Sequence, residues 1–311
     1  MSKGLVYIML VFMALFFSGA FITGKIAVLE FPAFSLVFFR FLIALPFIFA
    51  VLYWKEPQNL VPKKQDWPWL ILLGIIGTFF YHGLFFVCLK YTTAINSSLI
   101  GATNPMVTAF IAYLFCQEKM GLLQISGIIF SFFGVVMVVT DGGTLFARGM
   151  QFNPGDVLMF LAVCCMAVYS LISRHVMQRY ALSPIMITAY TFLICTVVSI
   201  PLVLWENSAT YWTSTTLGGW LSVLYMALFA SVGGYLFQMI GIQQIGAPRS
   251  AVFMNLVPAF AIVQSIIFLG ESFSLVKACS ALFIILGVYL ATRPVSKKNA
   301  NVDITFEEEN G

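Results

Sequence analysis

Two stretches of equal length decide the fold: AINSSLIGATNPMVTAFIAYLFCQE at 94–118 and APRSAVFMNLVPAFAIVQSIIFLGE at 247–271. A shift of 153 residues aligns them without a gap, and the alignment extends to 67–138 on 220–291. Overall identity is low, but residues that apolar stretches rarely share fall in one register: Trp67 on Trp220, Ala94 on Ala247, Ser97 on Ser250, Pro105 on Pro258, Glu118 on Glu271 and Gly134 on Gly287. The pattern indicates an internal duplication.

Composition indicates that lipid surrounds the chain. Of 311 residues, 61% are hydrophobic and 9% are charged, and the mean hydropathy is +0.97. Soluble domains carry roughly 25% charged residues, so this chain has too few charges to cover a surface that faces water. A helix that crosses a membrane needs about 20 mostly apolar residues.

Ten segments meet that requirement. They are 5–28, 33–54, 67–89, 94–116, 121–140, 157–178, 184–204, 218–242, 247–269 and 274–291. Barrel strands would alternate in short segments, whereas these apolar runs are long and continuous. The first run is longer than the apolar core of a signal peptide, and nine more follow it, so we interpret it as a span. The sequence predicts an all-α integral membrane protein with ten transmembrane helices.

The duplication divides these helices into two halves, 1–141 and 153–293, followed by a polar tail at 294–311 that we expect to be disordered. Five is an odd number, so the second half must enter the membrane with the opposite orientation. Inverted repeats are typical of carriers that bind substrate near the midplane and alternate between two openings.

The loops that hold most lysine and arginine face the cytoplasm. With a cytoplasmic N-terminus, that side holds Lys3, Lys55, Lys63, Lys64, Lys119, Arg174, Arg179, Arg249, Arg293, Lys297 and Lys298, and the other side holds Lys25, Lys90, Arg148 and Lys277. Both termini are therefore predicted to be cytoplasmic. The net charge of +4 comes from these flanking residues and does not indicate nucleic-acid binding.

Several motifs then carry a family resemblance. Residues 17–25 read FSGAFITGK, residues 39–44 read FRFLIA, and the duplicated stretches include Asn104-Pro105 and Asn255-Leu256-Val257-Pro258. In order and spacing, they make 4–293 resemble the EamA-like ten-helix carriers of the drug/metabolite transporter superfamily. Phe17-Ser18 replaces a Trp-Gly pair that is common there.

The resemblance implies a cavity lined by the first four helices of each half. It implies that the fifth and tenth helices lie at the periphery, where relatives often form homodimers. We expect a multi-pass protein of the bacterial inner (plasma) membrane, whose partners are the lipid bilayer and a small-molecule substrate.

Polar residues inside the spans are candidates for substrate binding: Ser18, Thr78, His82, Asn104, Tyr169, Tyr235, Gln238 and Asn255. His82 and Tyr235 are repeat mates, and Ser18 and Tyr169 take like positions in the first helix of each half. Pro105 and Pro258 can kink their helices. The alternatives are a packed, hydrogen-bonded histidine and kinks that only shape packing.

The charged residues leave further alternatives open. Arg40 could bind a substrate carboxylate or hold a helix end, and Lys25 could contact substrate or anchor the interface. Every carboxylate lies at a span end or in a loop, which favours a neutral or zwitterionic substrate over coupling through a buried acid. Glu118 and Glu271 are expected to accept N–H bonds at the start of the helix that follows each of them.

The sequence therefore predicts a carrier of an amino acid or related metabolite, working by efflux. The alternatives are uptake of a scavenged compound such as a nucleotide-derived one, a channel, or a membrane-embedded enzyme. An enzyme would place clustered histidine, aspartate or cysteine near an interface, and the sequence contains no such cluster and no zinc spacing among its six cysteines. We expect no catalytic activity, cofactor or metal.

Overall fold

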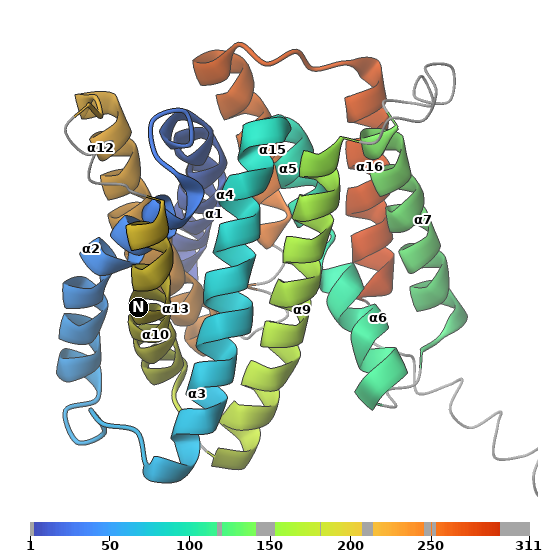
Figure 1. The fold of residues 1–311 in the computed structure, drawn as a ribbon. Coiled ribbons are helices and arrows are strands. Elements are labelled where there is room, and N and C mark those ends of the chain that lie inside the picture. The colour runs from blue at the N-terminus through green and yellow to red at the C-terminus, as the bar shows by residue number, and fades with distance from the viewer. Residues whose placement is uncertain are drawn as a thin grey trace, which may run out of the picture.

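The computed structural model describes residues 3–116, 120–140, 153–180, 182–206, 214–245, 250 and 253–292. Every regular element in these ranges is a helix (Figure 1). They are α1 Lys3–Ala27, α2 Ala33–Lys55, η1 Lys64–Asp66, α3 Trp67–Leu73, η2 Gly74–Phe80, α4 Tyr81–Tyr91, α5 Ala94–Gly101, α6 Asn104–Cys116, α7 Leu122–Val139, α9 Pro154–Tyr180, α10 Pro184–Trp205, α12 Leu217–Tyr225, η3 Met226–Gly234, α13 Tyr235–Ile245, α15 Leu256–Gln264, η4 Ser265–Leu269 and α16 Leu275–Ala291. The tail and Glu118 lie outside the described residues.

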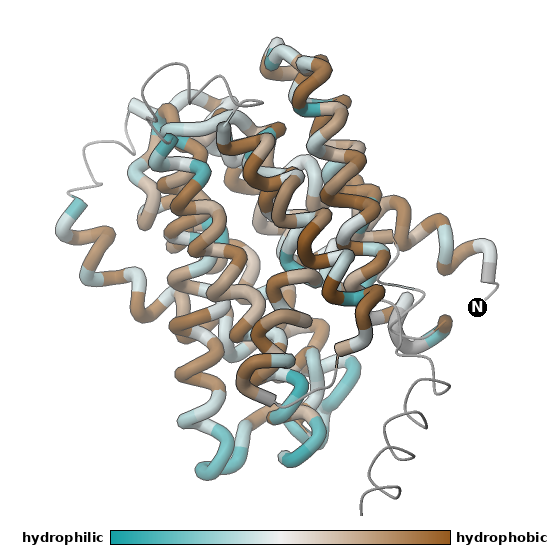
Figure 2. The backbone as a smooth tube through the Cα atoms, turned by 90° about the vertical axis from the view of Figure 1, so that its right-hand side faces the viewer, coloured by the Kyte–Doolittle hydropathy of each residue, from teal (hydrophilic) through white to brown (hydrophobic). Residues whose placement is uncertain are grey.

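The helices confirm the predicted fold class. Within the described ranges, eight continuous helical segments are long and apolar enough to cross a membrane, and two shorter apolar helices, Leu256–Leu269 and Leu275–Ala291, follow them. Hydrophobic residues dominate the helices, while hydrophilic ones gather in turns at helix ends (Figure 2). The helix breaks between Gly101 and Asn104, directly before Pro105, because proline cannot donate the N–H that a continuous helix needs.

The duplication is visible in unusual local structure. Both η2 and η3 are π-helical, and the shift of 153 residues places Gly74–Phe80 inside Met226–Gly234. Stretches of π-helix are rare, so their occurrence at equivalent positions supports a repeat. The same shift pairs Gly121 with Ser274, the residues that precede α7 and α16.

Helices of the two halves pack against one another. In the first half, α1 packs against α12, η3, α13 and α15 of the second half. In the second half, α9 packs against η2, α4, α5 and α6 of the first, while α2 packs against α10. The space enclosed between α1 and α9 is therefore walled by both halves.

The last helices of the two halves, α7 and α16, pack on each other with their backbones nearly touching. A Cβ atom on Gly127 would lie 2.6 Å from the carbonyl oxygen of Gly287, and one on Gly134 would lie 3.0 Å from that of Ser280. The repeat shift turns Gly127 into Ser280 and Gly134 into Gly287, so these are two copies of one contact. Small residues permit this close approach.

Three carboxylates join the halves at one end of the molecule, which we call the bridged end. Glu30 accepts hydrogen bonds from the backbone N–H and hydroxyl of Thr216, both at 2.7 Å. Glu206 accepts from the N–H of Phe34 at 3.1 Å, and from the N–H and hydroxyl of Ser35 at 2.9 and 2.8 Å. Each acid thereby holds the first turn of a helix in the opposite half.

Glu271 makes the third bridge and corrects an expectation. Its carboxylate accepts the N–H groups of Ala94 at 2.7 Å and Ile95 at 3.0 Å, at the start of α5. The prediction that it accepts helix-start N–H bonds was right, but the helix was wrong. The helix that follows it, α16, is capped by the Ser274 hydroxyl instead.

Candidate functional site

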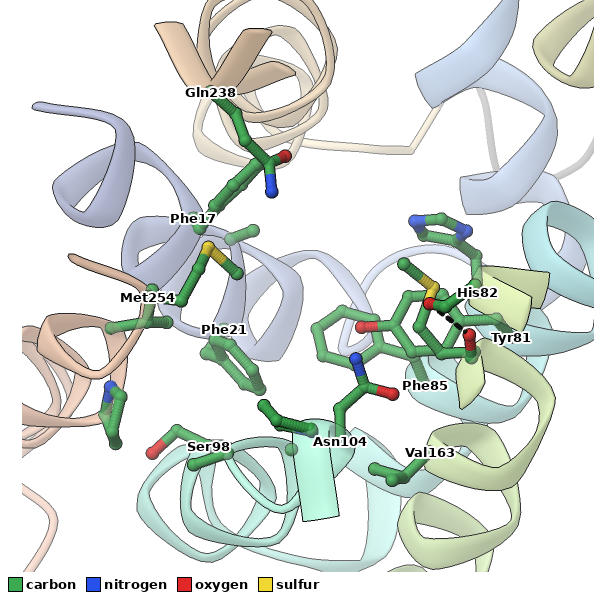
Figure 3. A pocket seen from close by; sticks show the side chains of 18 of the residues that line it. Phe17, Phe21, Tyr81, His82, Phe85, Ser98, Asn104, Val163, Gln238 and Met254 are labelled. Atoms are coloured by element: carbon green, nitrogen blue, oxygen red, sulfur yellow. Dashed lines mark hydrogen bonds between the residues drawn. The ribbon is translucent and has the colours of Figure 1, made fainter. Parts of the chain in front are cut away.

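A cavity of about 310 Å³ lies between the two halves. Its walls come from α1, α2, α4, α5, α6, α9, α13 and α15. It is lined by Phe17, Ala20, Phe21, Arg40, Tyr81, His82, Phe85, Ser98, Gly101, Ala102, Asn104, Pro105, Val163, Met166, Ser170, Tyr235, Gln238, Met254, Asn255, Val257 and Pro258. Figure 3 shows Gln238 and Asn104 on opposite sides of this space, with Phe17 and Phe21 between them along one wall.

Eight of the residues singled out from the sequence line this cavity. They are Arg40, His82, Asn104, Pro105, Tyr235, Gln238, Asn255 and Pro258. Asn104 and Pro105 enter it because α5 breaks before them, and Asn255 enters at the turn before α15. The structure thus brings together polar groups from four helices and from the turn before α15; that they contact substrate stays a prediction.

The other four residues lie outside the lining. Ser18 is fully buried, donates to the Leu15 carbonyl and accepts from the side chain of Gln264, both at 2.8 Å. The ring of Tyr169 packs against Gly77, where a Cβ atom would lie 2.0 Å from it. Thr78 is buried in η2.

Lys25 lies at the bridged end. Its ammonium group donates to the carbonyl oxygens of Leu89 at 2.5 Å and Thr92 at 2.7 Å, where α4 ends. A cation is favourable there, because the last carbonyls of a helix carry partial negative charge. These two hydrogen bonds link α1 to the end of α4.

His82 is buried and held in one orientation. Its Nδ1 lies 2.8 Å from the carbonyl oxygen of Thr78, and its ring packs edge-on against Phe41 and Tyr81 at 4.8 and 4.7 Å. A carbonyl oxygen only accepts, so this bond places a proton on Nδ1 and leaves Nε2 of the neutral ring as an acceptor.

Arg40 is 5% exposed and reaches from α2 across to the other half. Its Nε donates to the hydroxyl of Ser231 in η3 at 2.9 Å, and its guanidinium carbon lies 5.5 Å from the centre of the Phe41 ring. Within the described part of the chain, no carboxylate pairs with it.

The sequence reading missed most of the apolar lining. Phe21, Tyr81 and Met166 line the cavity, yet in a chain this rich in aromatic residues they are indistinguishable from packing. One signal was available: Phe17 and Phe21 are four residues apart, which puts both on one helix face. The described residues contain no group of three or more histidine, cysteine, aspartate or glutamate side chains that could hold a metal ion.

A helical membrane architecture with a cavity shared by two inverted halves is typical of membrane transporters. Residues 4–140 and 153–293 both match the model of the EamA-like transporter family. The chain belongs to this family and is an integral, multi-pass membrane protein.

Relatives of similar length support this assignment. An uncharacterized transporter of Bacillus subtilis, YyaM, is 32% identical over 92% of this chain and 93% of its own length. An uncharacterized transporter of Archaeoglobus fulgidus is 29% identical over 92% of this chain and 96% of its own. A protein of Streptantibioticus cattleyicolor, named a probable terminal-alkyne amino-acid exporter, is 24% identical over 68% of each chain.

A solved crystal structure shares the fold. It superposes with a TM-score of 0.62, covers 91% of this chain and 96% of the other, and is 19% identical.

Proposed function

We propose that this protein exports an amino acid or a related small metabolite by alternating access, with the cavity as the transit site. The observation that carries the proposal is the cavity itself, because residues of both inverted halves line it. Rocking the halves about a site they share would expose it first to one side of the membrane and then to the other.

The lining supports a small substrate with polar and apolar parts. About 310 Å³ falls at the lower end of the volumes typical of small-molecule sites. Side-chain amides from Asn104, Gln238 and Asn255 offer neutral donors and acceptors, while Phe17 and Phe21 offer apolar contact. The name of the Streptantibioticus relative supports an amino acid as substrate and export as direction.

The bridged end supports a gate. With the N-terminus in the cytoplasm, as the charge distribution favours, this end faces away from the cytoplasm. Opening it would require the bonds of Glu30, Glu206 and Glu271 to the opposite half to break. They would re-form as the halves close, so the three acids would stabilise one conformation and not the other.

Counterflow into proteoliposomes tests the proposal. Vesicles preloaded with one unlabelled L-amino acid at a time should accumulate the same labelled amino acid transiently for at least one member of the set, as a carrier requires. Gln238→Leu should reduce that accumulation, while Ser126→Ala, outside the cavity, should not. Counterflow of nucleosides alone would favour the nucleotide-derived alternative, and conductance without counterflow would indicate a channel.

A further inference from the structure

The guanidinium group of Arg40 has unused hydrogen-bonding capacity. A guanidinium carries five N–H donors, and the bond from Nε to Ser231 uses one of them. The side chain is 5% exposed and lines the cavity. Its other described neighbours are the face of Phe41 and the side chains of Tyr81 and Tyr235, which interact with it electrostatically without a described hydrogen bond.

Arg40 also lacks a counter-ion within the described structure. The described carboxylates, Glu30, Glu56, Asp66, Asp156, Glu206 and Glu271, all lie at helix ends or in turns. A guanidinium stays protonated in proteins, and removing a charge from water is expensive unless an opposite charge compensates it. An anion inside the cavity would supply that compensation.

We infer that Arg40 determines specificity by binding a carboxylate group of the substrate, which is therefore an organic carboxylate with an apolar body. This inference rests on the proposed carrier function. The bond to Ser231 fixes Nε and leaves the two terminal nitrogens, whose planar fork matches the two oxygens of a carboxylate. Ser231 belongs to the second half, so the bound substrate would contact a group held by both halves.

The aromatic wall fits the apolar body. The rings of Phe17 and Tyr235 meet edge-on at 5.6 Å, and those of Phe21 and Phe85 at 5.2 Å. All four residues line the cavity. Their faces and edges offer contact to an aliphatic or aromatic group.

An ammonium group would meet only neutral acceptors among the described lining residues. None of these residues is an acid, and Asn104, Gln238 and Asn255 offer neutral amide groups. An amino group would thus add a hydrogen bond, while the carboxylate would supply the charge pairing. The lining should accept amino acids and reject the amides and amines that correspond to them.

A structural role for Arg40 is the competing explanation, since the Ser231 bond links α2 to η3. The two roles predict different effects of an Arg40 substitution on ligand preference. A structural arginine would leave the affinity ratio of an acid to its amide unchanged when substituted, whereas a carboxylate-binding arginine would collapse that ratio.

The experiment is a thermal-shift titration of the purified full-length protein against the L-amino acids, their carboxamides and a set of nucleosides. Binding to the folded state raises the melting temperature. At least one acid should stabilise the protein at a half-saturating concentration at least tenfold below that of its amide. Arg40→Gln should abolish this preference, Arg40→Lys should retain part of it, and Ser231→Ala should retain most of it.

Equal stabilisation by acids and amides would overturn the inference, and so would an Arg40→Gln variant that keeps the wild-type preference. Where Arg40→Gln does not fold, Arg40→Lys carries the test, and an acid-to-amide ratio equal to that of the wild type would overturn the inference. Binding of nucleosides alone would overturn the carboxylate inference and leave a carrier, whereas absence of both binding and counterflow would overturn the carrier function as well.

Discussion

Replacing Glu206 with alanine should destabilise the protein more than any other change at the bridged end. The carboxylate accepts three hydrogen bonds from the start of α2: from the N–H of Phe34 and from both donors of Ser35. Ser35 is completely buried, and alanine at position 206 offers its hydroxyl no acceptor. The substitution leaves donors of a helix N-terminus without acceptors.

The expected loss can be worked from these three bonds. A hydrogen bond to a charged group contributes about 1.5–3 kcal/mol, and a buried donor left unsatisfied costs about 1–3 kcal/mol. The bonds share one carboxylate and are not additive, and Glu206 is itself only partly buried. We expect Glu206→Ala to lower the free energy of unfolding by about 2–4 kcal/mol, and Glu206→Gln by about 1 kcal/mol because one oxygen remains.

Equilibrium unfolding by SDS in mixed micelles measures these losses. Glu56→Gln is the matched control, because the Glu56 carboxylate makes no described hydrogen bond and only the backbone of that residue is bonded. Combining Glu206→Ala with Ser35→Ala isolates the pair energy, and the double variant should lose less than the two single losses added together. Strict additivity, or a Glu206→Ala loss no larger than that of Glu56→Gln, would refute the bridge.

Three further predictions concern packing, the buried histidine and the lysine. Gly287→Val should destabilise the protein by about 1–3 kcal/mol or more, because even a Cβ atom at this position would lie 2.3 Å from the Ser131 nitrogen. Gly4→Ala is the control: no atom lies within 4 Å of a Cβ there, so stability in the same assay should not change. His82→Gln should leave the pH dependence of counterflow unchanged on both sides of neutrality, since the ring serves as a fixed acceptor; a shifted profile would argue for a proton role. Lys25→Met should destabilise by about 1–2 kcal/mol through the two carbonyls it leaves, with substrate affinity unaltered; weaker binding would put Lys25 in the transport path.

The spans and the duplication were predictable because hydrophobic length and residue register are properties of the linear chain. The break before Asn104 was predictable for the same reason, since proline acts on its own helix. These features involve distances along the sequence only.

The inward face of each helix was less predictable. Ser18 and Tyr169 occupy like positions in the first helix of each half, yet both are packed outside the cavity lining. In a helix that is apolar all round, periodicity does not separate the face toward the cavity from the face toward a neighbouring helix. The bridges of Glu206 and Glu271 were hidden too, because their partners lie 171 and 177 residues away in sequence.

Counterflow by a variant with a filled cavity tests the central claim most directly. Ala102 lines the cavity, and Ala102→Phe would place a large ring in it. Leu282→Phe, at a residue 69% exposed on α16, is the control. We predict that wild type and Leu282→Phe show counterflow of the same amino acid and that folded Ala102→Phe shows none. If the Ala102→Phe variant showed as much counterflow as the wild type, the result would contradict a transit site between the two halves.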